Sequence, residues 1–263
     1  MVLLSCRMEL FARESGQGEP LVILHGLFGS SDNWYTIAKT FATQYKVYLV
    51  DQRNHGLSPH SDEFNYKLMT EDLNEFFTDH NIDKAIVIGH SMGGKAAMNF
   101  AVKFPDKVKK LIIVDITPRA YPLRHDYVIN GFKSIDLATL ESRTQADELM
   151  AKFVPEKDER QFLLKNLSRT SDGKFEWKPD VDAIAKNIAE IGTEMQYPGT
   201  YTGPSLFIRG ERSNYYKPDD EANILTIFPK AKFASIDSGH WVQAEKPQEF
   251  AQTVLDFLNS WDE

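Results

Sequence analysis

Short apolar segments recur along the chain and alternate with stretches in which apolar residues repeat at helical spacing. The apolar segments lack strict polar alternation, which is typical of strands covered on both faces. They occupy residues 21–24, 46–50, 85–88, 111–114, 205–208 and 233–236. Residues 69–77 and 250–258 each place four apolar side chains on one helical face. This alternation predicts a mostly parallel sheet with helices on both faces.

The pattern changes once, between residues 118 and 200. This segment contains no convincing buried strand, and helical, charge-rich pieces are expected instead at residues 145–153, 159–167 and 182–191. A run of proline and glycine then marks the return to a strand. We therefore predict a core formed by residues 1–117 and 201–263, with residues 118–200 inserted as a helical cap.

The composition is ordinary for a globular domain, with 42% hydrophobic and 26% charged residues among 263. The formal net charge of −8 argues against nucleic acid, whose phosphates favour clusters of Lys and Arg. Cys6 is the single cysteine, so it cannot form an intramolecular disulfide, and we interpret it as structural rather than reactive. Residues 1–4 are too short for a secretory signal, and no run approaches the roughly 20 apolar residues of a membrane span. A cytoplasmic protein that does not bind membranes is expected.

The sequence Gly-His-Ser-Met-Gly at residues 89–93 matches the GxSxG pattern of a nucleophile elbow. The pattern alone is common, but here a predicted strand precedes it and a predicted helix at residues 95–104 follows it. So tight a turn needs small residues around the serine. Three glycines meet that need: Gly89, Gly93 and Gly94. Ser91 is therefore the predicted nucleophile, rather than an incidental serine at a glycine-rich junction.

A serine hydroxyl needs a base to remove its proton, and His240 is the candidate. It lies in a short loop after the predicted strand at residues 233–236 and before a helix that begins near Pro247. The other six histidines are less well placed. Two of them, His25 and His55, lie in loop motifs and are predicted to hold those loops by hydrogen bonds.

An oxyanion hole needs two backbone N–H groups aimed at the carbonyl oxygen of the substrate. The residue after the nucleophile, Met92, supplies the first. The second is expected from the loop after the strand at residues 21–24, where Leu27 is the first choice and Phe28 is the alternative.

The commonest position of the catalytic acid carries no carboxylate in this chain. That position lies in the loop after the predicted strand at residues 205–208, where Ser213 and Asn214 are found. Neither side chain can supply the negative charge that stabilises a protonated imidazole. Glu211 lies in the same loop and is the alternative acid, although its closeness to the strand suggests that it points elsewhere.

Asp115 is the preferred acid. It follows the predicted strand at residues 111–114, which neighbours the nucleophile strand, so its side chain is expected at the sheet edge where the histidine lies. The chain order Ser, Asp, His is that of hydrolases with a nucleophile elbow. The competing interpretation is that Asp115 only caps the following turn. Asp51 and Asp237 are predicted to lie elsewhere.

Four motifs together resemble the α/β-hydrolase superfamily, and more narrowly the YbfF-type bacterial esterases. They are HGLFGS at residues 25–30, DQRNHGLS at 51–58, GHSMGGK at 89–95 and GHW at 239–241. The resemblance covers essentially the whole chain and is weakest across the cap. It implies an α/β-hydrolase fold with the acid at the end of the strand before the cap, which agrees with Asp115, and with Ser213 replacing the usual acid. It also implies hydrolysis of short acyl esters, with acyl-coenzyme A thioesters as a further candidate.

The predicted reaction is acyl transfer to Ser91 followed by hydrolysis, with a small acyl ester or thioester as substrate and with no cofactor or metal. The same triad could serve C–C bond hydrolysis, cofactor-free haloperoxidase or lyase chemistry, and a non-enzymatic ligand-binding module is a further alternative. Basic residues of the cap either meet coenzyme A phosphates or form a solvated helix face: Arg119, Arg124, Lys133 and Arg143. Aromatic residues of the cap either pack in its core or line a pocket: Phe132, Phe153, Phe162 and Trp177. A homodimer formed through the cap is compatible with the sequence.

Overall fold

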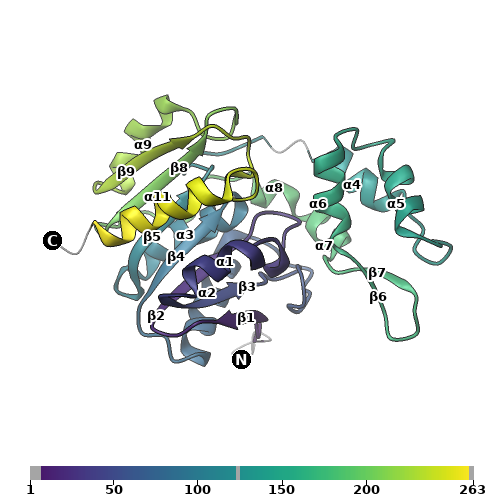
Figure 1. Cartoon of the computed structure of the whole chain (residues 1–263), viewed down its shortest axis with the longest axis horizontal. Helices are drawn as coiled ribbons and strands as arrows, with labels where there is room; N and C mark the ends of the chain where they lie inside the picture. Colours follow the sequence, from purple (N-terminus) through teal and green to yellow (C-terminus); the bar gives the residue numbers. More distant parts are fainter. Residues whose placement is uncertain (1–6, 123–124, 261–263) are drawn as a thin grey trace, which may run out of the picture.

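The computed structural model describes residues 7–122 and 125–260, so the predictions for Cys6, Arg124 and residues 1–4 lie outside the described residues. A seven-stranded sheet lies at the centre, in the order β1-β3-β2-β4-β5-β8-β9 (Figure 1). Its strands are β1 (Ala12–Ser15), β2 (Glu19–Leu24), β3 (Tyr45–Val50), β4 (Ala85–His90), β5 (Val108–Val114), β8 (Ser205–Gly210) and β9 (Ala231–Ile236). Neighbouring strands run parallel except β1, which is antiparallel to β3. All six strands predicted from the apolar segments are confirmed.

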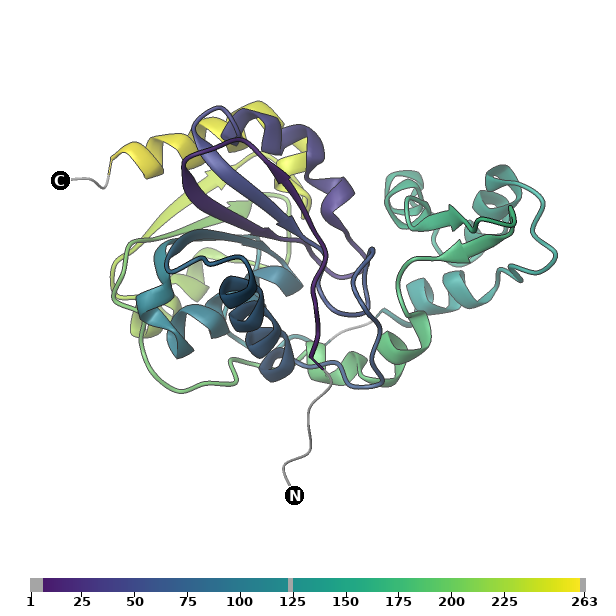
Figure 2. The same cartoon turned by 90° about the horizontal axis from the view of Figure 1, so that it is seen from below.

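Helices cover both faces of the sheet, because successive side chains of a strand point to opposite sides. In β2, Val22 and Leu24 belong to the buried cluster that includes α2 (Tyr66–Asp79) and α3 (Met92–Lys103). Leu21 and Ile23 belong to the cluster on the other face, with α1 (Tyr35–Phe41) and α11 (Pro247–Asn259). Figure 2 shows α1 and α11 above the sheet and α2 below it. Both predicted helical faces are therefore confirmed as core contacts.

The other core elements are short. They are α9 (Glu221–Ile227), α10 (Val242–Glu245) and three 3-10 turns at Ser31–Asn33, Pro105–Lys107 and Pro218–Asp220. None of the helices in the described part of the chain combines the length and the hydropathy needed to cross a lipid bilayer.

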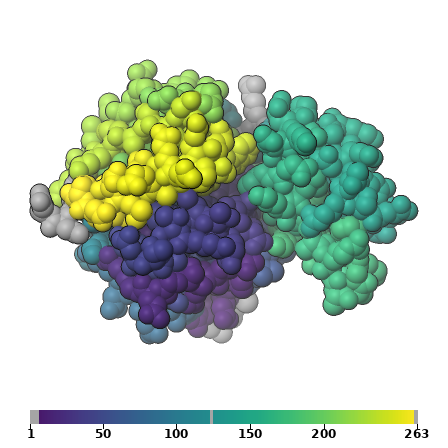
Figure 3. Space-filling model, viewed as in Figure 1, coloured from purple at the N-terminus to yellow at the C-terminus, as the bar shows by residue number. Residues whose placement is uncertain are grey.

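Residues 118–122 and 125–200 form an insert between β5 and β8. Most of it makes a lobe beside the core (Figure 3), and its last residues return along α3, where the Gln196 N–H donates to Asn99 Oδ1 at 2.8 Å. The insert contains α4 (Asp126–Lys133), α5 (Arg143–Met150), α6 (Lys157–Leu164), β6 (Leu167–Arg169), β7 (Phe175–Trp177), α7 (Val181–Lys186) and α8 (Ile188–Ile191). No buried strand was expected in the insert, and the short antiparallel pair of β6 and β7 was not predicted. Each of these strands has only one buried residue, Leu167 or Phe175, which leaves no alternating pattern to detect.

Parallel strands present their carboxyl ends at one edge of the sheet, and this edge carries the predicted chemistry. Ser91 follows β4, Asp115 follows β5, and His240 lies in the loop after β9. The insert closes over the same edge, since residues from both parts line one cavity there. The topology thus brings three residues that are distant in sequence to one place.

Candidate active site

Ser91 lies at the sharp turn between β4 and α3. Its φ of 52° and ψ of −120° fall in a region that non-glycine residues rarely adopt, as expected for a strained nucleophile turn. The turn leaves no room for bulk, because a Cβ on Gly93 would lie 2.5 Å from the carbonyl oxygens of Leu24 and His25. The Ser91 N–H donates to the Val114 carbonyl oxygen at 3.0 Å, which ties the turn to β5.

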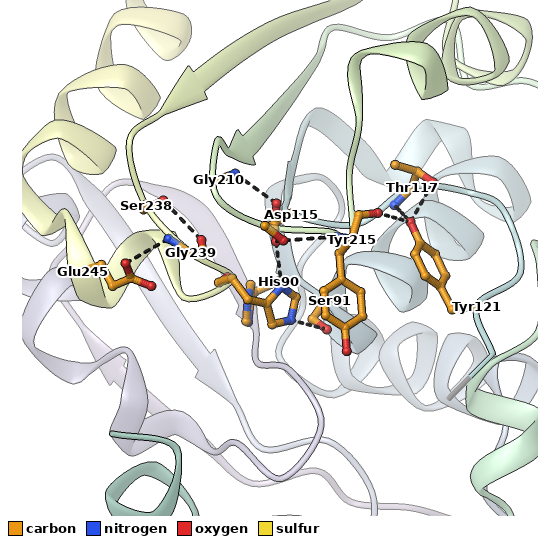
Figure 4. Close-up of polar contacts among 12 residues, drawn as sticks. His90, Ser91, Asp115, Thr117, Tyr121, Gly210, Tyr215, Ser238, Gly239 and Glu245 are labelled. Carbon is orange, nitrogen blue, oxygen red and sulfur yellow. Dashed lines mark hydrogen bonds and ion pairs between the residues drawn. The ribbon is translucent and has the colours of Figure 1, made fainter. Parts of the chain in front are cut away.

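Hydrogen bonds join three side chains at this edge of the sheet (Figure 4). His240 Nε2 lies 3.0 Å from Ser91 Oγ, and His240 Nδ1 lies 2.7 Å from Asp115 Oδ2. Because an ionised carboxylate only accepts hydrogen bonds, Nδ1 carries the proton and Nε2 is left to accept from the serine. This is the tautomer that a general base needs.

Asp115 is completely buried at the end of β5, and three donors surround its carboxylate. Oδ1 accepts from the Gly210 N–H at 2.9 Å. Oδ2 accepts from the Ser213 hydroxyl as well as from His240. Such charge-assisted bonds offset the cost of burying a carboxylate. Ser213, at the position where the acid is commonest, therefore donates to the Asp115 carboxylate.

The alternative carboxylates lie away from His240. Glu211 is exposed, and its backbone N–H continues the sheet by donating to the Ile236 carbonyl oxygen at 2.9 Å. Asp237 pairs with Arg212. Asp51 accepts from two backbone N–H groups of neighbouring loops, at 2.5 and 2.9 Å. Within the described residues, none of these three carboxylates contacts the histidine.

The loop after β2 distinguishes the two candidate oxyanion donors. The Phe28 N–H donates to His55 Nε2 at 3.1 Å, so it is already engaged. Burial lowers the pKa of His55 to about 3, which keeps the ring neutral and able to accept. The Phe28 carbonyl oxygen accepts from the Asn166 side chain of the insert at 2.7 Å. The N–H groups of Leu27 and Met92 meet no acceptor among residues 7–122 and 125–260, and both residues line the cavity beside Ser91.

Comparison with known proteins identifies the family of this chain. Residues 19–247 match the family model described as the alpha/beta hydrolase fold. The chain belongs to the α/β-hydrolase family. The resemblance inferred from the four motifs is thereby confirmed.

Three relatives of this α/β hydrolase are similar over most of their length. A solved structure described as a marine microorganism esterase has a TM-score of 0.92 at 44% identity, over 95% of this chain and 99% of that one. Esterase YbfF of Escherichia coli (strain K12) is 36% identical over 250 residues, 94% of this chain and 96% of that protein. The sn-1-specific diacylglycerol lipase ABHD11 of Danio rerio is 39% identical over 253 residues, 92% of this chain and 79% of that protein.

Two neighbours that the sequence did not reveal hold His240 of this α/β hydrolase in place. Tyr215 stacks on the imidazole with ring centres 4.1 Å apart and planes 25° apart. His90 Nε2 donates to the His240 carbonyl oxygen at 2.9 Å. Burial lowers the pKa of His90 well below its ordinary value, so this histidine stays neutral. His90 had a signal, since it belongs to the elbow motif, whereas Tyr215 belongs to none.

A cavity of about 270 Å³ lies above Ser91, between the core and the insert. Of the four aromatic residues named in the sequence analysis, Phe132, Phe153, Phe162 and Trp177, Phe162 lines this cavity. Phe132 is buried between Phe28 and Trp177, with ring centres at 5.0 and 4.8 Å, and Phe153 is 39% exposed. The insert lines the cavity with eight residues: Tyr121, His125, Tyr127, Val128, Glu159, Phe162, Leu163 and Ile191.

The described basic residues of the insert do not gather at the cavity. Arg119 pairs with Asp220 at 3.0 Å, and Lys133 pairs with Asp182 at 2.8 Å. Arg143 donates to two backbone carbonyl oxygens of the insert itself. These contacts favour structural or solvated roles over recognition of coenzyme A phosphates.

Proposed function

We propose that this α/β hydrolase is a serine ester hydrolase that cleaves carboxylic esters or thioesters through an acyl-enzyme on Ser91. The proposal rests on the hydrogen-bonded chain from Ser91 through His240 to Asp115 beside a cavity. Relatives named as esterases or as a lipase favour an ester over C–C bond hydrolysis, haloperoxidase or lyase chemistry.

The mechanism follows from the position of each group. His240 takes the hydroxyl proton as Ser91 Oγ attacks the acyl carbonyl carbon, and the N–H groups of Leu27 and Met92 stabilise the oxyanion. The alcohol or thiol leaves with the proton that His240 returns. Water deprotonated by His240 then attacks the acyl-enzyme and releases the acid. Asp115 holds the imidazole tautomer and stabilises its positive charge in both steps.

The size of the cavity favours a small acyl group. Its volume of about 270 Å³ lies just below the range of about 300–1,000 Å³ that is usual for ligand cavities. Residues 118–200 line much of it, so we assign them the role of a cap that limits chain length. Acetyl and butyryl esters are therefore expected to react faster than long-chain esters.

The test is hydrolysis of a nitrophenyl ester series, from acetate to palmitate, by the wild type and Ser91→Ala. We expect Ser91→Ala to lose about 10⁶-fold in turnover, as is usual when such a nucleophile is removed. Ser168→Ala, in strand β6 of the cap, is the matched control and should keep full activity. A fluorophosphonate should label the wild type but not Ser91→Ala. Activity retained by Ser91→Ala, or a wild type inert on every ester, would exclude the proposal.

A further inference from the structure

Lys95 is a buried lysine in the wall of the cavity. Lys95 lies on α3, one helical turn after Ser91, and its backbone N–H donates to the Ser91 carbonyl oxygen at 3.0 Å. Only 1% of the residue is exposed to solvent. Its Nζ lies 5.0 Å from the ring centre of Tyr121 and 5.8 Å from that of Tyr66, and all three residues line the cavity. The ammonium group is therefore at the cavity wall, one turn away from the nucleophile.

One of the three N–H groups of this ammonium makes no hydrogen bond within the described residues. Nζ donates to the Arg119 carbonyl oxygen at 2.6 Å and to the Thr193 carbonyl oxygen. An ammonium has three N–H groups, so one remains for another acceptor. In the described part of the chain no carboxylate forms a hydrogen bond or an ion pair with Lys95, and Glu194 acts on it only at longer range. A buried charge without a counter-ion is costly, and a carboxylate entering the cavity would supply the missing partner.

The electrostatic surroundings agree with this shortage of negative charge. Burial and, to a smaller extent, the positive charge of Arg119 lower the pKa of Lys95 to about 7, and Glu194 acts in the opposite direction. The rings of Tyr66 and Tyr121 complete the surroundings of the ammonium. A bound carboxylate would favour the charged lysine, since an opposite charge nearby stabilises it.

The two ends of the cavity differ in their access to solvent. Tyr127 is 40% exposed and donates to Glu159 at 2.7 Å, which marks the open end. Tyr66 is 1% exposed and lies beside Lys95, which marks the closed end. The alcohol must depart while the acyl group stays bound to Ser91. The alcohol therefore fits the open end, and the acyl chain extends toward Lys95.

We propose that Lys95 binds a carboxylate at the far end of the acyl chain, so that the preferred substrates are monoesters of short dicarboxylic acids. The inference rests on the proposed ester hydrolase function and narrows its substrate class. Lys95 follows Ser91 by four residues, so their backbones lie about 6 Å apart along the helix axis, and the lysine side chain adds to this separation. A series of succinyl, glutaryl and adipyl groups therefore tests which separation of ester and carboxylate fits best.

The experiment compares mononitrophenyl esters of succinate, glutarate and adipate with nitrophenyl alkanoates of equal length, below pH 7 where the ammonium form of Lys95 predominates. We expect Lys95→Met to lower kcat/KM for the acidic esters by about 10- to 100-fold, mainly through KM, because a bond to a charged group is lost. The alkanoates should lose much less than the acidic esters, because they carry no group that the ammonium could bind. Lys103→Met removes a lysine from the same helix outside the cavity, where Lys103 contacts Glu71, and should change neither class.

The other possible outcomes separate the inference about Lys95 from the proposed ester hydrolase function. An equal loss for both classes in Lys95→Met would make Lys95 a strut between Arg119 and Thr193 and overturn the inference. A wild type that hydrolyses alkanoates but rejects the acidic esters would overturn it while leaving the ester hydrolase intact, whereas inertness toward all esters would overturn both. A second test needs no variant: it compares the inhibition of the wild type by free glutarate with its inhibition by free pentanoate. Stronger inhibition by glutarate supports carboxylate binding, and equal inhibition refutes it.

Discussion

Replacing Asp115 with asparagine tests the proposed role of this buried carboxylate. Oδ1 accepts from the Gly210 N–H, which is fixed by the backbone. Oδ2 faces two groups that can adapt, because the Ser213 hydroxyl can rotate and His240 can change tautomer. The amide therefore keeps its oxygen toward Gly210 and turns its NH₂ group toward the imidazole. His240 Nδ1 then accepts, Nε2 carries the proton, and Ser91 loses its base.

The expected loss is large although the geometry is preserved. The wrong histidine tautomer costs a serine hydrolase about 10⁴-fold in kcat. At 1.36 kcal/mol for each factor of ten, this corresponds to about 5 kcal/mol of transition-state stabilisation. The assay is steady-state hydrolysis of nitrophenyl butyrate, with thermal unfolding of each variant measured in parallel. Asp115→Asn should lose about 1.5–3 kcal/mol in unfolding free energy, because the Ser213 hydroxyl no longer donates to a charged acceptor, while the Gly210 N–H keeps its partner.

Glu211→Gln is the matched control, because it makes the same chemical change in an exposed carboxylate of the loop that usually carries the acid. It should keep wild-type turnover. Near wild-type turnover in Asp115→Asn, together with an inactive Glu211→Gln, would refute the reasoning and place the acid in the loop after β8.

Three further predictions follow from buried contacts. Ser213→Ala removes a donor from the Asp115 carboxylate, so chemical denaturation should show a loss of about 1.5–3 kcal/mol in unfolding free energy, with the 2.7 Å bond to the histidine left in place. Gly93→Ala introduces a Cβ 2.5 Å from two carbonyl oxygens. We expect it to destabilise the fold by about 1–3 kcal/mol and to abolish ester hydrolysis, which thermal unfolding and the nitrophenyl assay would detect. Burial lowers the pKa of His25 to about 4 and that of His55 to about 3, so as pH falls below the ordinary histidine value the unfolded chain binds protons that the folded chain does not. The free energy of unfolding should therefore fall by about 1.4 kcal/mol per pH unit for each of these two histidines as pH falls from the ordinary histidine pKa toward about 4. Urea unfolding across this pH range would measure the loss.

An opposite result would contradict each of these three predictions. An unchanged unfolding free energy in Ser213→Ala, with Ser168→Ala as control, would mean that the hydroxyl bond adds nothing to stability. A fully active Gly93→Ala would show that the turn can widen without moving Ser91. A stability that stays constant below the ordinary histidine pKa would contradict the burial of His25 and His55 as neutral rings.

The central strands could be predicted from the sequence because burial on both faces leaves uninterrupted apolar runs. All six residues of β4 are buried, and its run of apolar residues is unmistakable. The edge strand β1 has the sequence ARES and no buried residue, so it leaves no such pattern. The β6–β7 pair escaped prediction for the same reason. Burial of the element, more than its type, determined whether it could be predicted.

The candidate site divides in a similar way. Ser91, Asp115 and His240 could be selected because each follows a strand, and the structure places all three together; their catalytic roles stay predictions. The sequence ranked Leu27 before Phe28, but the bond that engages the Phe28 N–H could not be predicted, because its acceptor is His55, 27 residues further along the chain. The surroundings of Lys95 were equally hidden, since they come from backbone carbonyl groups at the two ends of the insert.

The bond between Asn166 and the Phe28 carbonyl oxygen limits how the enzyme could be re-engineered. Asn166 is 2% exposed and belongs to the insert, whereas Phe28 follows directly on the proposed oxyanion donor Leu27. Exchanging residues 118–200 for the insert of a relative would be the obvious route to a new substrate range. A graft without an amide donor at this position would leave a buried carbonyl oxygen unpaired next to the oxyanion loop. Chimeras should therefore be chosen by whether they keep this donor, before the shape of the new pocket is considered.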